Sequence, residues 1–138
     1  MRQLSALRNV PFALLISIGC LGCGGGTDRP KLGKITGTVT YKGKAIPEGE
    51  ITFYPENGRS ATGQISSGEI TDVHTFDPDD GLPVGKLKVT VSAYNGPKDD
   101  MYKPPKLITP EKYNNVKTTD LSVDIEPGEN SKNFELKD

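Results

Sequence analysis

The chain has 138 residues, enough for one domain of ordinary size. Hydrophobic residues make up only 33%, tryptophan is absent, and 16 glycines and 11 prolines favour turns. This composition excludes a large helical bundle, a transporter and a large α/β enzyme, and it permits a small β domain with a thin core. The formal net charge is −1 and neither sign forms a long block, so we expect no nucleic-acid partner.

Residues 1–23 are typical of an export signal. Residues 1–9 carry two arginines, and residues 10–19 are uncharged and mostly apolar. Signal peptides have an apolar stretch of about 7–15 residues, whereas a membrane-spanning helix needs about 20. We therefore expect an N-terminal signal helix that is removed on export.

The signal resembles that of bacterial lipoproteins, in which a small residue precedes the lipidated cysteine. Cys20 and Cys23 compete for this role, and neither has the usual leucine three positions earlier. Cys20 has the more acceptable residue there, Ser17, whereas Cys23 is followed by three glycines that would begin a tether. The resemblance implies lipidation of one of the two, a membrane partner through the lipid anchor, and a location in the bacterial cell envelope, in the periplasm or at the cell surface.

The exported part divides into a glycine-rich polar tether at 24–33 and a folded domain at 34–138. No cysteine lies in the domain, so it folds without disulfide bonds. Apolar and polar residues alternate in seven short segments separated by turn residues, which predicts an all-β fold, a seven-stranded antiparallel β-sandwich. The expected strands lie at 34–41, 50–54, 61–66, 69–76, 86–94, 121–125 and 133–137.

The strand at 86–94 has the clearest pattern. Its inward residues are Leu87, Val89, Val91 and Ala93. Thr90 belongs to the opposite face, so Thr90→Asp should be tolerated better than Val89→Asp. In the strand at 69–76 the apolar residues change parity, which predicts a β-bulge.

Residues 95–118 contain four prolines and no strand periodicity. We expect one short turn of helix there, capped by Thr109, and no contribution to any strand. If the domain binds an envelope protein or a polysaccharide, we expect this segment to be the binding surface. The alternative, which we favour, is that its tyrosines pack the loop onto the sheet edge. The candidate binding residues are Tyr94, Tyr102, Lys103 and Tyr113.

Three stretches carry a family resemblance: TGTVTYKGKAIPEGEITFYPE (36–56), GLPVGKLKVTVSA (81–93) and LSVDIEPGENSKNFEL (121–136). They resemble the carboxypeptidase regulatory-like domains found in many small bacterial lipoproteins. The resemblance covers about residues 34–137 and departs from the family pattern at 67–70. It implies a transthyretin-like or immunoglobulin-like sandwich without catalytic activity.

His74 is the single histidine, and it would be the base of any serine hydrolase site, oriented by Asp72 or Asp77. No Gly-x-Ser-x-Gly nucleophile motif accompanies it. Asp72, Asp77, Asp79 and Asp80 could offer oxygen ligands to calcium, but their spacing is not that of an EF-hand. We therefore expect a non-catalytic envelope lipoprotein with no cofactor or metal. The alternative is a small hydrolase or calcium-dependent module in the 72–80 region.

Overall fold

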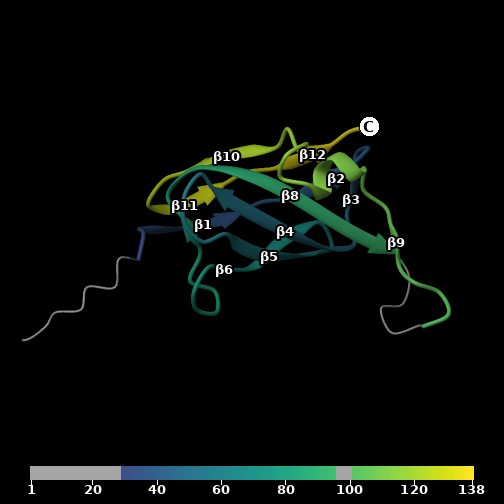
Figure 1. Ribbon diagram of the computed structural model, residues 1–138, viewed down its shortest axis with the longest axis horizontal. Coiled ribbons are helices and arrows are strands. Elements are labelled where there is room, and N and C mark those ends of the chain that lie inside the picture. The colour runs from purple at the N-terminus through teal and green to yellow at the C-terminus, as the bar shows by residue number, and fades with distance from the viewer. Residues whose placement is uncertain (1–28, 96–100) are drawn as a thin grey trace, which may run out of the picture.

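A computed structural model describes residues 29–95 and 101–138 of the chain (Figure 1). The predicted signal helix with its two cysteines, and the tether up to residue 28, lie outside the described residues. The first strand begins at Leu32, inside the range expected to be tether. Within the described part of the chain, no helix is long and apolar enough to cross a membrane.

The described residues form an all-β fold with twelve strands, where seven were expected. The predicted 34–41 strand is divided in two, and four short strands escaped the sequence analysis because two to four residues are too few to show alternation. The strands are β1 (Leu32–Thr36), β2 (Val39–Tyr41), β3 (Lys44–Ala45), β4 (Glu48–Pro55), β5 (Ala61–Ser66), β6 (Glu69–His74), β7 (Leu82–Pro83), β8 (Gly85–Asn95), β9 (Lys106–Leu107), β10 (Ser122–Ile125), β11 (Gly128–Ser131) and β12 (Phe134–Leu136). One 3-10 helix, η1 (Glu111–Asn114), precedes β10.

The largest sheet is antiparallel, in the order β10-β8-β4-β5-β6, with β9 paired to the end of β8. Two smaller sheets have the orders β11-β1-β7 and β12-β2-β3. In these sheets β1 pairs with β11, and β2 with β12, in parallel. The prediction of a wholly antiparallel fold is therefore wrong at these two pairings. Residue alternation has the same period in both kinds of sheet, so it does not reveal strand direction.

Gly37 divides the predicted first strand. A Cβ atom at this position would collide with the backbone carbonyl oxygen of Lys132. On both sides of Gly37 the strand stays bonded to the C-terminal segment. Lys132 N donates to Thr36 O over 2.9 Å, and Phe134 N donates to Thr38 O over 2.8 Å. The glycine thus lets the strand pass from one small sheet to the other while remaining beside the C-terminal segment.

The sheets enclose one hydrophobic core. The inward residues predicted for β8 are confirmed, since all four are fully buried. Phe53 of β4 and Phe134 of β12 meet across the core with ring centroids 6.5 Å apart, which joins the large sheet to a small one. The other large, fully buried side chains are Ile46, Ile51, Ile65, Leu82, Leu87, Ile125, Leu136, Val39, Val89 and Val91.

Thr90 is buried, with 5% of its surface exposed, although alternation places it on the outer face. The segment after β9 runs along β8: Thr119 Oγ1 donates to Val89 O over 2.7 Å, and Val89 N donates to Leu121 O over 3.0 Å. Thr52, which lies opposite Thr90 on β4, is buried as well, and η1 packs against β8, so the centre of β8 is shielded on both faces. Thr90→Asp would therefore also bury an unpaired charge, and its better tolerance relative to Val89→Asp stays a prediction.

The predicted bulge in the 69–76 strand is confirmed. Thr62 of β5 pairs with His74, but Gln64 pairs with Thr71, so β6 carries one extra residue. The extra residue falls between Thr71 and His74, and Asp72 in this interval has a backbone φ of 51°. The bulge turns both Ile70 and Val73 toward the core.

Candidate functional site

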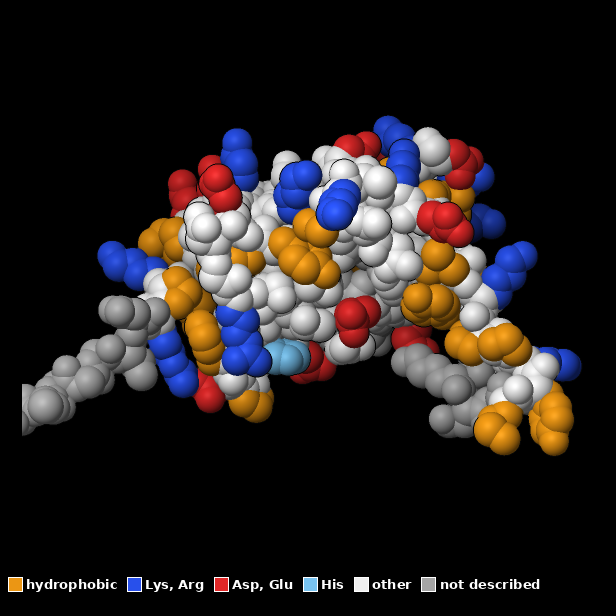
Figure 2. All heavy atoms as spheres, in the orientation of Figure 1, with side chains coloured by type: hydrophobic (Ala, Val, Ile, Leu, Met, Phe, Trp, Pro, Cys, Tyr) orange, Lys and Arg blue, Asp and Glu red, His pale blue; other side chains and the backbone are white. Residues whose placement is uncertain are grey.

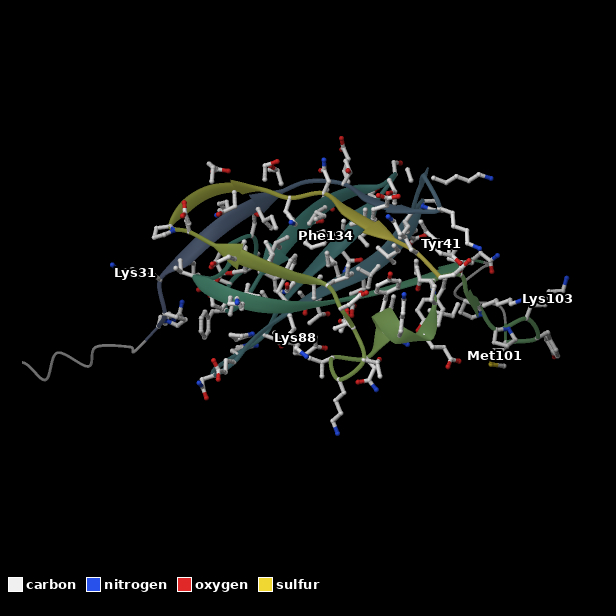
Figure 3. All side chains as sticks on the ribbon, turned by 90° about the horizontal axis from the view of Figure 1, so that it is seen from above. Lys31, Tyr41, Lys88, Met101, Lys103 and Phe134 are labelled. Atoms are coloured by element: carbon white, nitrogen blue, oxygen red, sulfur yellow. The ribbon has the colours of Figure 1, made fainter. Side chains whose placement is uncertain are left out.

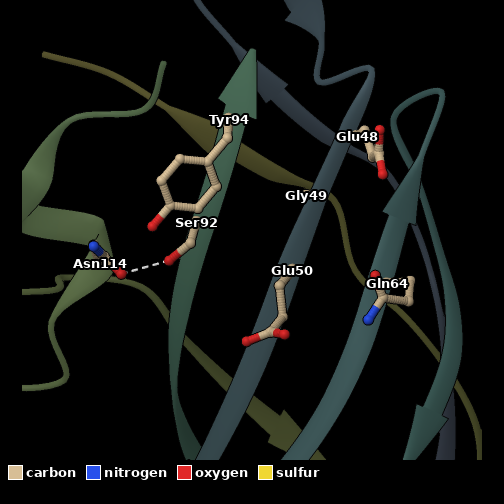
Figure 4. Close-up of a pocket in the computed structure, with 7 residues that line it drawn as sticks. All are labelled: Glu48, Gly49, Glu50, Gln64, Ser92, Tyr94 and Asn114. Carbon is tan, nitrogen blue, oxygen red and sulfur yellow. Dashed lines mark hydrogen bonds between the residues drawn. The ribbon is translucent and has the colours of Figure 1, made fainter. Parts of the chain in front are cut away.

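A polar groove lies on the outer face of β4, β5 and β8, beside η1 (Figure 4). Its volume is about 390 Å³. We call it the β4–β8 groove, and it is lined by Glu48, Gly49, Glu50, Gln64, Ser92, Tyr94 and Asn114. The groove follows from alternation, since the outward residues of β4 and β8 lie between inward residues that fill the core.

Strand register brings three of the lining side chains together. Glu50 of β4 lies opposite Gln64 of β5 on one side and opposite Ser92 of β8 on the other. Side chains directly opposite each other in antiparallel strands have Cβ atoms about 4.5–5.5 Å apart. The carboxylate of Glu50 is therefore flanked by an amide and a hydroxyl on a rigid sheet surface.

One wall of the groove is closed by η1. Ser92 Oγ donates a hydrogen bond to Asn114 Oδ1 over 2.5 Å. Because the amide oxygen of Asn114 is used in this way, its NH₂ group remains as a donor. The bond also commits the Ser92 hydroxyl to an amide oxygen, which is not a base that would activate a nucleophile.

Tyr94 stands at the rim of the groove with 43% of its surface exposed. Figure 4 shows its ring beside Ser92, on the side away from Glu48 and Gln64. Pairing of Tyr94 with Leu107 of β9 fixes the backbone at this position. Two carboxylates and no basic side chain line the groove, and Glu48 also takes part in an interaction within the chain.

The four predicted binding residues do not form one surface. Tyr94 lines the groove, whereas Tyr102 and Lys103 are exposed in a segment that projects from one end of the molecule (Figure 3). Tyr113 of η1 is buried, with 2% of its surface exposed, and its hydroxyl accepts a hydrogen bond from Lys137 N over 3.0 Å. Tyr113 therefore belongs to the core, which is a correction to the sequence analysis.

The segment 95–118 also differs from expectation in its second half. β9 pairs with Tyr94 and Asn95 at the end of β8, so the segment does contribute to a sheet. The short helical turn is confirmed as η1, but Thr109 is not its cap. Thr109 Oγ1 instead accepts a hydrogen bond from Ala93 N over 3.4 Å, which fastens the segment to β8.

Sequence reasoning missed Glu50, Gln64, Ser92 and Asn114. Each has an outward position that alternation could reveal, but many surface residues share that property. Their convergence depends on β4 lying between β5 and β8, which no local pattern in the sequence indicates. Tyr94 was found because it lies directly beside the tyrosine-containing segment 95–118.

The aspartates of the 72–80 region organise their own loop. The Asp80 carboxylate accepts hydrogen bonds from the backbone N–H groups of Thr75, Phe76 and Asp77, over 2.6, 3.0 and 3.0 Å. Burial acts to raise the pKa of Asp80, but the three backbone donors outweigh it and hold the pKa below its ordinary value. This carboxylate therefore serves the turn.

The remaining groups of this region are surface contacts. His74 is exposed, and its Nδ1 lies 2.9 Å from the carbonyl oxygen of Asp72. Asp77 pairs with Arg29 over 2.5 Å, and Asp79 lies 3.4 Å from Lys34 Nζ. Across residues 29–95 and 101–138, no group of three or more histidine, cysteine, aspartate or glutamate side chains could hold a metal ion. Asp72, His74, Asp77 and Asp79 line a pocket of about 330 Å³, and the ion pairs engage the carboxylates of Asp77 and Asp79 that a hydrolase or calcium site would use.

Comparison of the chain with protein-family models, curated proteins and solved structures returned no match. The resemblance to carboxypeptidase regulatory-like domains consequently rests on the sequence motifs alone. The function of the groove has to be argued from its position and chemistry.

Proposed function

We propose that the chain is a non-catalytic lipoprotein of the bacterial cell envelope, whose β domain presents the β4–β8 groove to a ligand. The observation that carries this proposal is the position of the groove relative to the start of the described chain. Figure 3 shows Lys31 at one end of the long axis and Met101 and Lys103 at the other. The groove lies toward the second end, where β8 runs into β9 (Figure 1).

The length of the tether supports this orientation. If Cys23 is lipidated, five residues, 24–28, separate it from Arg29. An extended chain covers at most about 3.5 Å per residue, so Arg29 would stay within roughly 20 Å of the membrane surface. Lipidation of Cys20 would extend this limit to roughly 30 Å. The opposite end of the domain, with the groove, would then face away from the membrane and toward ligands in the envelope.

The chemistry of the groove supports binding in preference to catalysis by a serine, cysteine, histidine or lysine side chain. Ser92 is bonded to an amide, and the lining contains no histidine, cysteine or lysine. Carboxylate, amide and aromatic groups on a rigid sheet are suited to holding a ligand. The resemblance to carboxypeptidase regulatory-like domains agrees with this, because it implies an accessory domain without chemistry. Under this proposal the divided first strand and the strands β4, β5, β6, β8, β10 and β12 correspond to a seven-stranded, transthyretin-like or immunoglobulin-like sandwich.

Metabolic labelling with a fatty-acid analogue tests the anchor. We expect the wild-type chain to be labelled and to remain in the membrane fraction. The double variant Cys20→Ser with Cys23→Ser should lose the label, because no thiol remains to be acylated. The two single variants are the matched controls, and only the one that removes the lipidated cysteine should behave as the double variant does. Persistent labelling of the double variant would contradict the proposal.

A further inference from the structure

We infer that the β4–β8 groove binds an uncharged carbohydrate chain, with one sugar ring against the side chain of Tyr94. This inference rests on the proposed function, because it names the ligand class of the same groove. Its basis is the combination of hydrogen-bond donors, acceptors and an aromatic face in one open site (Figure 4).

The polar lining matches the hydroxyl groups of a sugar. Gln64 offers both a donor and an acceptor, Asn114 keeps its NH₂ donors because Ser92 occupies its oxygen, and Glu50 accepts only. Each sugar hydroxyl can donate one hydrogen bond and accept others, and neighbouring hydroxyls follow one another along the ring. A polyhydroxylated ligand can therefore satisfy all three side chains at once.

Tyr94 supplies the apolar contact. Its ring is 43% exposed at the rim of the groove, and its backbone is paired on β8 and β9. A sugar ring has a face of C–H groups that can cover an aromatic ring and remove apolar surface from water. Because the backbone that carries the tyrosine is already paired, binding requires little further ordering of the main chain.

A cationic peptide is the competing ligand class, since Glu48 and Glu50 both line the groove. An ammonium or guanidinium group has donors only, so a cationic side chain could bind the carboxylates but could not accept from Gln64 or Asn114, and only the backbone carbonyls of the peptide could do so. Glu48 also already interacts with another group of the chain. The volume of about 390 Å³ falls within the range of about 300–1,000 Å³ that is typical of small-ligand sites. The donor and acceptor balance favours the neutral ligand.

The test is a titration of the full chain, as purified from the expressing bacterium, in phosphatidylcholine nanodiscs. Detergents with sugar head groups are avoided because they would compete for the groove. The probes are chitotriose, cellotriose and maltotriose, with trilysine as the cationic probe. With at least one trisaccharide, we expect saturable NMR shifts of the Gln64 and Asn114 side-chain amides and of the Tyr94 backbone amide.

Substitutions locate the site. Tyr94→Ala should weaken binding of that trisaccharide about tenfold, which corresponds to losing one aromatic contact of about 1.4 kcal/mol. Tyr94→Phe keeps the ring and should bind nearly as well as the wild type. Tyr102→Ala, a change of the same residue type at the projecting segment, is the matched control and should have no effect. Thermal melting of each variant verifies that the fold is intact.

Three results would overturn the inference. The first is that no trisaccharide shifts the groove resonances. The second is that trilysine binds there and that its affinity falls with added salt and with Glu50→Gln. The third is that Tyr102→Ala weakens saccharide binding as much as Tyr94→Ala does. If fatty-acid labelling fails, the proposed lipid anchor is refuted, but the saccharide titration can still be interpreted. If labelling succeeds and no saccharide binds, only the inference of a carbohydrate ligand is refuted.

Discussion

Asp80 shows how a single side chain organises a loop of this domain. Its carboxylate accepts three backbone N–H groups, and the neighbouring Thr75 Oγ1 donates to Gly81 O over 2.8 Å. These bonds satisfy backbone groups that would otherwise have no partner where β6 ends. The aspartates that suggested a calcium site in the sequence therefore have two structural roles. Asp80 accepts the backbone hydrogen bonds of the turn, and Asp77 and Asp79 form ion pairs on the surface.

We predict that Asp80→Ala lowers the free energy of unfolding by about 1–2 kcal/mol at pH 7, because it leaves three backbone donors without an acceptor. The stabilisation from the lowered pKa of Asp80 is present above the ordinary value of 3.8 and is lost as pH falls through the folded-state value. Urea unfolding at pH 7 and at pH 3 should therefore show a smaller difference between wild type and variant in acid.

The control for this prediction is Asp77→Ala, which removes only an exposed ion pair with Arg29. Such pairs contribute little to stability, so the urea midpoint should hardly move. Equal effects of the two substitutions would show that the backbone hydrogen bonds of Asp80 are not what stabilises the loop.

At the scale of elements, the segment after β8 has two parts with different roles. Residues 101–104 are exposed, and Met101 and Tyr102 each have 92% of their surface accessible. In Figure 2 hydrophobic side chains gather at the end where this part projects. The later part, with β9 and η1, is bonded to β8 and sends Tyr113 into the core. The interpretation in which tyrosines pack the segment against the sheet therefore holds for Tyr113 of the later part, whereas residues 101–104 stay exposed.

We predict that Tyr113→Phe lowers the free energy of unfolding by about 1 kcal/mol, because it removes the hydroxyl that accepts from Lys137 N. Tyr113→Ala should cost about 3–5 kcal/mol through the cavity it leaves. Replacing residues 101–104 with glycine and serine should leave the melting temperature unchanged. Thermal unfolding of the three variants measures this difference, and a large loss from the loop replacement would show that the projecting part also stabilises the fold.

At the scale of the whole molecule, the two ends of the domain are held side by side. β1 and β2 pair in parallel with β11 and β12, so residues about a hundred positions apart must meet before either pair forms. Tyr41 OH donates to Asp138 Oδ1 over 2.5 Å and adds a contact at the C-terminus. Closing such long loops costs chain entropy. Because contacts between distant residues form slowly, we expect these two strand pairs to form late in folding.

We predict that Gly37→Ala lowers the free energy of unfolding by about 3 kcal/mol, because its new methyl group would displace the Lys132 carbonyl and separate the paired ends. Gly43→Ala is the control: nothing lies near that position, and only the φ of 76° disfavours alanine, at about 1 kcal/mol. Chemical unfolding of both variants gives the comparison. Similar losses would mean that the close approach at Gly37 is readily relieved.

The sequence by itself determined the features that depend on local order along the chain. Alternation identified the inward residues of β8, and the parity change identified the bulge in β6. The export signal and the lipidation of one cysteine stay predictions, because residues 1–28 lie outside the described residues. The inferences about strands work because a strand repeats every two residues.

Only the tertiary structure decided which strands are neighbours and in which direction they run. The parallel pairing of the chain ends, the burial of Thr90 and the inward position of Tyr113 each depend on segments far apart in the sequence. The groove has the same origin, because Glu50, Gln64 and Ser92 become neighbours through the order of β5, β4 and β8. The physical reason is that burial of apolar surface is a property of the whole core, and many strand orders satisfy the same local alternation.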